Sequence, residues 1–208
     1  GSGASFTFDG TKLVLKLKGD NIAVGENPID YARIAVYVDG KRVVDEMIDC
    51  AEKEVTVIDH TENAQSVVEI IKLSESPMSA VGVEAFTEGS AEALPEKPLK
   101  IEFIGDSITC GYGVDDEDEN HQFTTATEDV TKAYAYKTAK ALDAEYSMFS
   151  ASGYGIVSGY TEGDEPISEQ TIPQFYCSYG FSRGNFAGTA PQLSLIHISE
   201  PTRHSLIS

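Results

Sequence analysis

Leu99-Lys-Ile-Glu-Phe-Ile-Gly105-Asp106-Ser107-Ile-Thr-Cys110-Gly111-Tyr-Gly113 is the stretch around which the 208-residue chain is organised. Its first half is rich in β-branched and aromatic residues and follows two prolines, which is typical of a buried strand. Its second half has the glycines of a tight turn and carries the Ser107 hydroxyl near the tip. In α/β sheets, ligands bind just beyond the carboxyl ends of the strands. The stretch therefore predicts a strand that presents Ser107 to a ligand.

Ser107 is the candidate nucleophile of an ester hydrolase, provided that a neighbouring base takes the proton of its hydroxyl. The alternative is a Gly-Asp-Ser turn without chemistry, because the tripeptide alone is a weak signal. The apolar strand before Ser107 and the two glycines after it, Gly111 and Gly113, favour the nucleophile. We expect Asp106 to fix the turn through side-chain to backbone hydrogen bonds and not to act in a triad.

The composition narrows the classes of partner. The chain has 15 basic and 34 acidic residues, and its formal net charge is −19. Nucleic acids and anionic membrane surfaces are bound through Lys and Arg, so neither is an expected partner, and a neutral partner such as a sugar is favoured. No run approaches the roughly 18 apolar residues of a membrane-spanning helix. The oligomeric state has no signal in the sequence.

The cysteines and the acidic loop indicate no metal site. Cys50, Cys110 and Cys177 are odd in number and widely spaced, which fits neither a disulfide framework nor a metal knuckle. The acidic run Asp115–Asn120 is typical of a solvated surface loop. It lacks the glycine that an EF-hand loop has at its sixth position, which argues against calcium. We therefore expect no metal and no cofactor.

Residues 1–94 are expected to form an all-β domain, a sandwich or jelly roll, because short apolar runs alternate with turn signals. Asp39-Gly40 is a strong hairpin signal, since a two-residue turn needs positive φ. A turn is also expected at Asp9-Gly10, and Ser90–Pro98 is expected to be a stiff connector. The predicted strands are Ser5–Phe8, Lys12–Leu17, Arg33–Val38, Lys41–Asp45, Glu54–Ile58, Ser66–Leu73 and Ala80–Phe86.

Residues 95–192 change to the alternation of an α/β domain. Thr125–Glu128 has capping-box spacing, and the alanine-rich segment after it, up to Ala144, has the apolar spacing of a helix. Tyr146–Ala151 is the next predicted strand. Together with the strand before Ser107 these segments form one βαβ unit.

The glycine turn Ser152–Gly155 ends the second strand of this unit. If the two strands are parallel, the turn lies at the same sheet edge as Ser107. The backbone N–H of Gly153 and that of Ser107 would then form part of an oxyanion hole. A turn of purely structural importance is the alternative.

Three blocks of this sequence resemble the SGNH (GDSL-like) hydrolases, and within them carbohydrate esterase family two, the acetylxylan esterase type. The resemblance covers about residues 3–192. It implies a small jelly-roll domain followed by a flavodoxin-like α/β hydrolase domain. It also implies a secreted or cell-surface serine esterase that removes O-acetyl groups from plant-wall polysaccharides without a cofactor. The blocks are Ile104–Gly113, Thr127–Tyr136 and Ser152–Ile156, with further similarity at Lys72–Glu75 and Ile172–Tyr176.

The resemblance implies that Ser107 is the nucleophile and one oxyanion donor, and that Gly153 is the second donor. The family pattern also needs an oxyanion Asn and a His base, and neither occurs here in its family context. Residues 193–203 resemble a translated sequencing adapter, so we expect 193–208 to be a spurious tail on a partial hydrolase domain, 95–192. His197 and His204 lie in that tail, and we assign the base to neither. We therefore expect this chain to be nearly inactive and its parent to be an esterase.

His121 lies in the acidic loop, and His60 lies in the β-rich half, far along the chain from Ser107, so neither histidine argues for a catalytic base.

Two other functions stay open at this stage. The β-rich half is also compatible with a carbohydrate-binding module, although the chain has no Trp for a sugar platform. The remaining alternative is an SGNH enzyme that acts on another ester, such as a lipid or a thioester.

Overall fold

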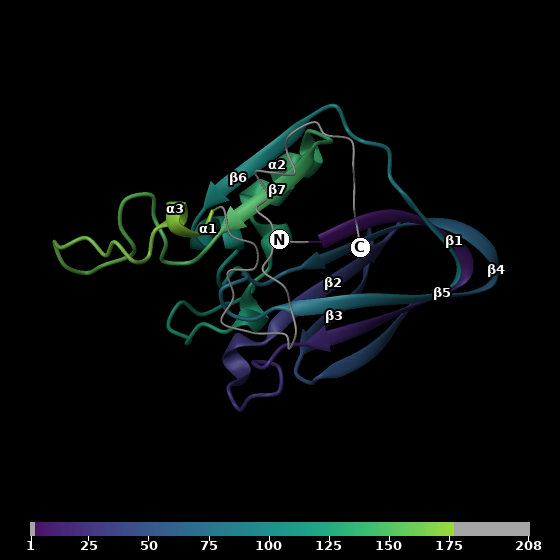
Figure 1. Cartoon of the computed structure of the whole chain (residues 1–208), viewed down its shortest axis with the longest axis horizontal. Coiled ribbons are helices and arrows are strands. Elements are labelled where there is room, and N and C mark those ends of the chain that lie inside the picture. The colour runs from purple at the N-terminus through teal and green to yellow at the C-terminus, as the bar shows by residue number, and fades with distance from the viewer. Residues whose placement is uncertain (1–2, 177–208) are drawn as a thin grey trace.

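The computed structural model describes residues 3–176, which form a large antiparallel sheet and a small parallel one (Figure 1). The large sheet has the strand order β3-β2-β4-β1-β5. A short 3-10 turn, η1 (Pro28–Asp30), precedes β2. The strands are β1 (Gly3–Gly19), β2 (Ala32–Val38), β3 (Lys41–Ile48), β4 (Glu52–Lys72) and β5 (Val81–Ala93).

The turn expected at Asp9-Gly10 is wrong, because β1 runs through this position as one strand. A register shift between Gly10 and Lys12 marks a bulge, and the strand stays paired with β4 and β5 on both sides of it. Gly10 permits this close approach, because a Cβ there would lie 2.5 Å from the Glu88 carbonyl oxygen of β5. Bulges bend strands and increase their twist. Figure 1 shows the long strands β1, β4 and β5 curving at one side of the molecule.

The expected sandwich or jelly roll is not confirmed, because the strands of residues 3–93 belong to one sheet. This sheet still encloses a core, since its bent strands bring many apolar side chains into one cluster. The buried members include Phe8, Leu13, Leu15, Leu17, Ile34, Val36, Ile48, Ile58 and Val68. The hairpin prediction is confirmed: Asp39 and Gly40 have φ of 51° and 80° and connect β2 to the antiparallel β3.

The small sheet consists of β6 (Lys100–Gly105) and β7 (Glu145–Ser150), which are parallel as predicted. Helices α1 (Ser107–Cys110) and α2 (Tyr134–Ala141) lie between the two strands in the sequence, and α3 (Ile172–Phe175) follows β7. No helix among residues 3–176 is long and apolar enough to cross a membrane.

The predicted capping box at Thr125–Glu128 is wrong. The Thr125 hydroxyl makes tertiary hydrogen bonds instead, to the carbonyl oxygens of Ile29 at 3.0 Å and Tyr31 at 2.6 Å. Two 3-10 turns, η2 (Thr125–Thr127) and η3 (Val130–Lys132), occupy the segment, and the helix itself begins only at Tyr134.

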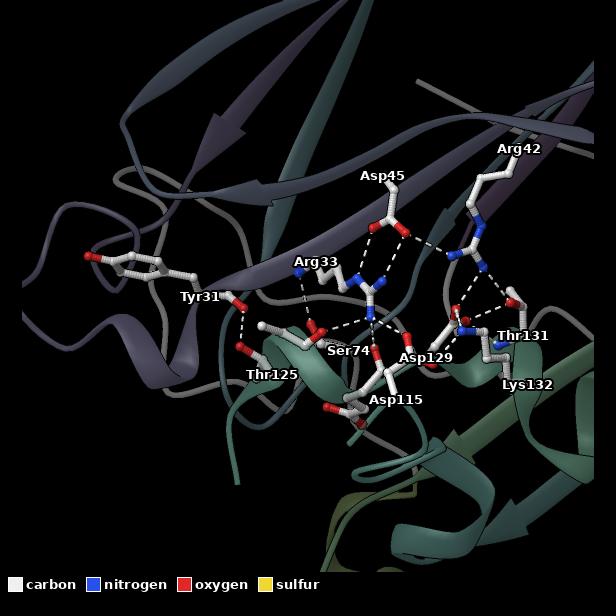
Figure 2. A network of polar contacts seen from close by, with 12 residues as sticks. Tyr31, Arg33, Arg42, Asp45, Ser74, Asp115, Thr125, Asp129, Thr131 and Lys132 are labelled. Atoms are coloured by element: carbon white, nitrogen blue, oxygen red, sulfur yellow. Dashed lines mark hydrogen bonds and ion pairs between the residues drawn. The ribbon is translucent and has the colours of Figure 1, made fainter. Parts of the chain in front are cut away.

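A network of charged side chains attaches residues 115–132 to the large sheet (Figure 2). Arg33 of β2 binds Asp45 through two hydrogen bonds of 2.8 Å, and its Nη1 also donates to Asp115 at 2.9 Å. Arg42 of β3 donates to the fully buried Asp129 at 2.7 Å. Lys132 also pairs with Asp115. Strands β2 and β3 thus hold the segment that leads from α1 to α2.

This network makes the fold sensitive to acid. Burial opposes the charge of Asp45 and Asp115. At Asp45 this effect is outweighed by Arg33 and Arg42, and at Asp115 by Lys132 and Arg33, so the pKa of each carboxyl is lowered. A carboxyl whose pKa is lowered in the folded state stabilises the fold at pH values above its unfolded pKa of 3.8. The fold loses this stabilisation as the pH falls below 3.8 and through the folded-state pKa. We expect the urea midpoint to fall between pH 5 and pH 3. Asp45→Asn should show a smaller fall, and an equal fall would contradict this account.

Candidate active site

Ser107 is the first residue of α1 and follows directly after β6. The Asp106 carboxylate caps the helix, and its Oδ1 accepts a hydrogen bond of 3.1 Å from the N–H of Ile108. Gly111 ends the helix with a φ of 78° and donates its N–H to the Ser107 carbonyl oxygen. The Ser107 side chain is half-buried, and its hydroxyl has no hydrogen bond to another residue within 3–176. The described residues therefore leave this hydroxyl unengaged.

The glycine turn after β7 lies at the same sheet edge. Gly105 pairs with Ser150, and the N–H of Ala151 extends this pairing to the Gly105 carbonyl oxygen at 3.2 Å. Gly153 adopts a φ of 80°, which favours glycine. Its carbonyl oxygen accepts a hydrogen bond of 2.7 Å from Tyr160. Neither the N–H of Gly153 nor that of Ser107 donates to another described residue, which leaves two backbone donors at this edge.

A buried carboxylate contacts both sides of this edge from the large sheet. Glu75 follows β4, and its Oε2 accepts a hydrogen bond of 2.7 Å from the N–H of Ser152. The same oxygen lies 3.8 Å from the Sγ of Cys110, at the end of α1. Lys72 fixes the backbone here, because its Nζ donates to the carbonyl oxygens of Ser74 at 2.7 Å and Glu75 at 2.9 Å. Glu75 thus connects the large sheet with the helix of Ser107 and the turn of Gly153.

Lys72, Glu75 and Cys110 form a buried polar group together with Glu128, which is 0% exposed. Burial, followed by the charge of Glu75, raises the pKa of Glu128 to about 8. Burial lowers the pKa of Lys72 to about 8, against the attraction of Glu128 and Glu75. Burial and the two glutamates raise the pKa of the Cys110 thiol. One oxygen of Glu75, one of Glu128 and the Sγ of Cys110 lie within 4.8 Å of one another and could hold a metal ion.

Sequence reasoning missed this group as a site. Lys72–Glu75 and Thr127–Tyr136 were recognised only as blocks of family resemblance. The one local signal is a charged residue inside an apolar run, as Lys72 is between Ile71 and Leu73. That signal does not reveal the partners, because they come from distant parts of the chain.

The histidines give Ser107 no base among the described residues. His121 is exposed, and its Nδ1 lies 2.9 Å from the Oδ1 of Asp116. His60 lies exposed on β4. Neither hydrogen-bonds to Ser107, and His197 and His204 lie outside the described residues. The described residues therefore place one hydroxyl and two backbone N–H groups at this edge, with no histidine beside the hydroxyl.

No known family profile matches the chain, but curated proteins and solved structures are similar to it. The chain is 29% identical over 201 residues to the cellulase/esterase CelE of Acetivibrio thermocellus, covering 95% of this chain and 24% of the relative. It is 29% identical over 189 residues to an acetylxylan esterase / glucomannan deacetylase of Cellvibrio japonicus, covering 88% and 48%. The chain thus spans a quarter to a half of the length of these curated relatives.

A solved structure has the same fold over most of this chain. It is a family two carbohydrate esterase from Clostridium thermocellum in complex with cellohexaose, with a TM-score of 0.69 and 26% identity. The match covers 92% of this chain and 57% of that one. The predicted resemblance is therefore confirmed: over most of its length the chain is similar in sequence and fold to carbohydrate esterases of family two.

Proposed function

We propose that this chain carries the nucleophile and oxyanion donors of a serine esterase that removes O-acetyl groups from plant-wall polysaccharides. The observation that carries the proposal is the placement of the Ser107 hydroxyl and the unengaged N–H groups of Ser107 and Gly153 at one sheet edge. The substrate class is supported by the Cellvibrio japonicus relative, which is named for acetylxylan and glucomannan deacetylation. The net charge of −19 agrees with a neutral polymer as partner.

In the proposed mechanism, Ser107 Oγ attacks the acetyl carbonyl carbon while a histidine takes the hydroxyl proton. The N–H groups of Ser107 and Gly153 bind the oxyanion that forms, and Asp106 keeps the turn in place. The sugar hydroxyl leaves with the proton, and water then releases acetate from the acyl-enzyme. The histidine and an asparagine as third oxyanion donor are implied by the family resemblance and have no counterpart within residues 3–176.

The domain boundaries and the location are part of this proposal. Residues 1–94 form the β-rich part, 95–192 the partial hydrolase part and 193–208 the unrelated tail. Removal of acetyl groups from wall polysaccharides takes place outside the cell, so a secreted or cell-surface enzyme fits the substrate.

A grafted chain tests the proposal. Residues 1–192 are joined to the C-terminal part of the Cellvibrio japonicus relative, which supplies the missing base. Acetate release from acetylated xylan is measured for this graft and for the 208-residue chain. We expect the graft to release acetate and the 208-residue chain to stay near the uncatalysed rate, because a serine without a base is a poor nucleophile. A folded but inactive graft, or a fully active 208-residue chain, would contradict the proposal.

A further inference from the structure

The buried group behind the glycine turn contains polar atoms that the protein leaves unsatisfied. Both carboxylate oxygens of Glu128, the Oε1 of Glu75 and the Oγ of Ser152 are buried, and none makes a hydrogen bond of normal length and angle within residues 3–176. The backbone N–H of Glu75 is close enough to the Glu128 carboxylate to act against the rise of its pKa, but it does not satisfy both oxygens. Buried carboxylates in proteins are paired, protonated or bound to a metal ion. Unsatisfied buried groups in a native fold therefore point to a bound species.

Lys72 does not satisfy these oxygens. Its Nζ donates to the Ser74 carbonyl oxygen, the Ser74 hydroxyl and the Glu75 carbonyl oxygen, which uses all three ammonium hydrogens. A proton shared between Glu75 and Glu128 would engage one oxygen of each residue. The second oxygen of Glu128 and the hydroxyl of Ser152 would still make no hydrogen bond of normal length and angle within residues 3–176.

We propose that Glu75, Cys110 and Glu128 bind a divalent cation of the zinc class, which cross-links the large sheet to the helix of Ser107. Their ligand atoms lie within 4.8 Å of one another, and the Oε2 of Glu75 is 3.8 Å from the Sγ of Cys110. Ordinary zinc–oxygen and zinc–sulfur bonds at a tetrahedral angle place two such atoms about 3.6 Å apart. Three protein ligands leave the fourth position to a water molecule.

The charges favour a divalent ion with a thiolate ligand. The lysine at position 72 and the two glutamates, when ionised, sum to −1. Binding of M²⁺ displaces the Cys110 thiol proton and any proton held by Glu128; these protons pass to the buffer, and the thiolate–metal and carboxylate–metal bonds form. The charges of the metal ion, the Cys110 thiolate, the two glutamates and the lysine then sum to zero. A thiolate beside two carboxylates selects zinc or cobalt over magnesium or calcium, which prefer oxygen ligands alone.

This proposal does not depend on esterase activity, and cobalt tests it directly. The tag-free 208-residue chain is dialysed against a chelator, titrated with Co²⁺ and followed by absorption spectroscopy. We expect one Co²⁺ per chain, a thiolate-to-cobalt charge-transfer band and the release of at least one proton. Cys110→Ser should lose the band. The double variant Cys50→Ser/Cys177→Ser should keep it, because Cys50 is outside the group and neither cysteine is a proposed ligand.

Glu128→Gln tests whether the Glu128 carboxylate is a ligand of the metal ion. It preserves the shape of the side chain, and we expect it to weaken Co²⁺ binding at least about tenfold, the smallest effect typical of groups that support a metal site. Circular dichroism of each variant checks its fold, and the unmodified chain decides the question alone if a variant does not fold. Absence of the band in the unmodified chain would overturn the proposal and leave a proton or water as the occupant. A band that persists in Cys110→Ser would overturn it as well.

Discussion

Ser107→Ala in the grafted chain should lower the rate of p-nitrophenyl acetate hydrolysis by at least about 10³-fold, because it removes the proposed nucleophile, on which the acyl-enzyme would form. The proposed oxyanion donors, the N–H groups of Ser107 and Gly153, belong to the backbone and stay in place. The residual rate should therefore exceed the rate in buffer. The thermal midpoint should stay unchanged, because no described residue hydrogen-bonds to the hydroxyl that is lost.

Ser90→Ala is the matched control. Ser90 lies exposed on β5, so its removal should change neither the rate nor the midpoint. If Ser107→Ala kept more than a tenth of the activity, another residue would be the nucleophile. If its midpoint fell together with the rate, the loss of activity would report on folding.

Arg33→Ala should lower the free energy of unfolding by roughly 2–3 kcal/mol, because it removes the main partner of the partly buried Asp45 and leaves Asp115 with Lys132 alone. The Arg33 side chain is only 12% exposed, and those of Asp45 and Asp115 are 34% and 18% exposed. Arg33 also donates to the carbonyl oxygens of Ala126 and Glu128, so the segment before α2 would lose these contacts with β2 as well. Urea unfolding followed by circular dichroism measures the change.

Two variants frame this result. Arg33→Lys keeps the charge but not the planar two-pronged hydrogen bonding to Asp45, so its stability should lie between those of the unmodified chain and Arg33→Ala. Lys18→Ala removes an exposed partner of Glu84 and should leave the urea midpoint unchanged. Equal midpoints for Arg33→Ala and Lys18→Ala would show that the Arg33 network does not stabilise the fold.

The features predicted correctly from the sequence are those encoded by adjacent residues. The apolar run before Gly105 specifies β6, and Asp39-Gly40 specifies its hairpin, because strand propensity and positive φ are local properties. The parallel pairing of β6 and β7 follows from the βαβ order of the segments.

The errors occur where a distant segment changes the outcome. Asp9-Gly10 has turn residues, but two neighbouring strands continue the pairing past them and turn the irregularity into a bulge. Thr125 has the spacing of a helix cap, but its hydroxyl binds the carbonyl oxygens of Ile29 and Tyr31, about 95 positions earlier. The sandwich or jelly roll, which is not confirmed, likewise depends on long-range pairing of strands.

The candidate site divides in the same way. Ser107 and Gly153 could be found because each follows a strand and carries a recognisable turn. Glu75, Cys110 and Glu128 share no spacing, and only the folded chain brings them together. Their burial also hides them from reasoning by residue type, since isolated Glu and Lys residues are usually taken as solvated.

The β-rich part is not structurally independent of the hydrolase part. The Glu75 carboxylate accepts a hydrogen bond from the turn of Gly153, while Arg33 and Arg42 hold the segment that leads to α2. A hydrolase part expressed without residues 1–94 would lose these contacts together, and in the β-rich part alone Arg33 and Arg42 would keep only Asp45 as a carboxylate partner. If the β-rich parts of two relatives are exchanged, the hybrid should therefore fold only when the residues that make these contacts are transferred together.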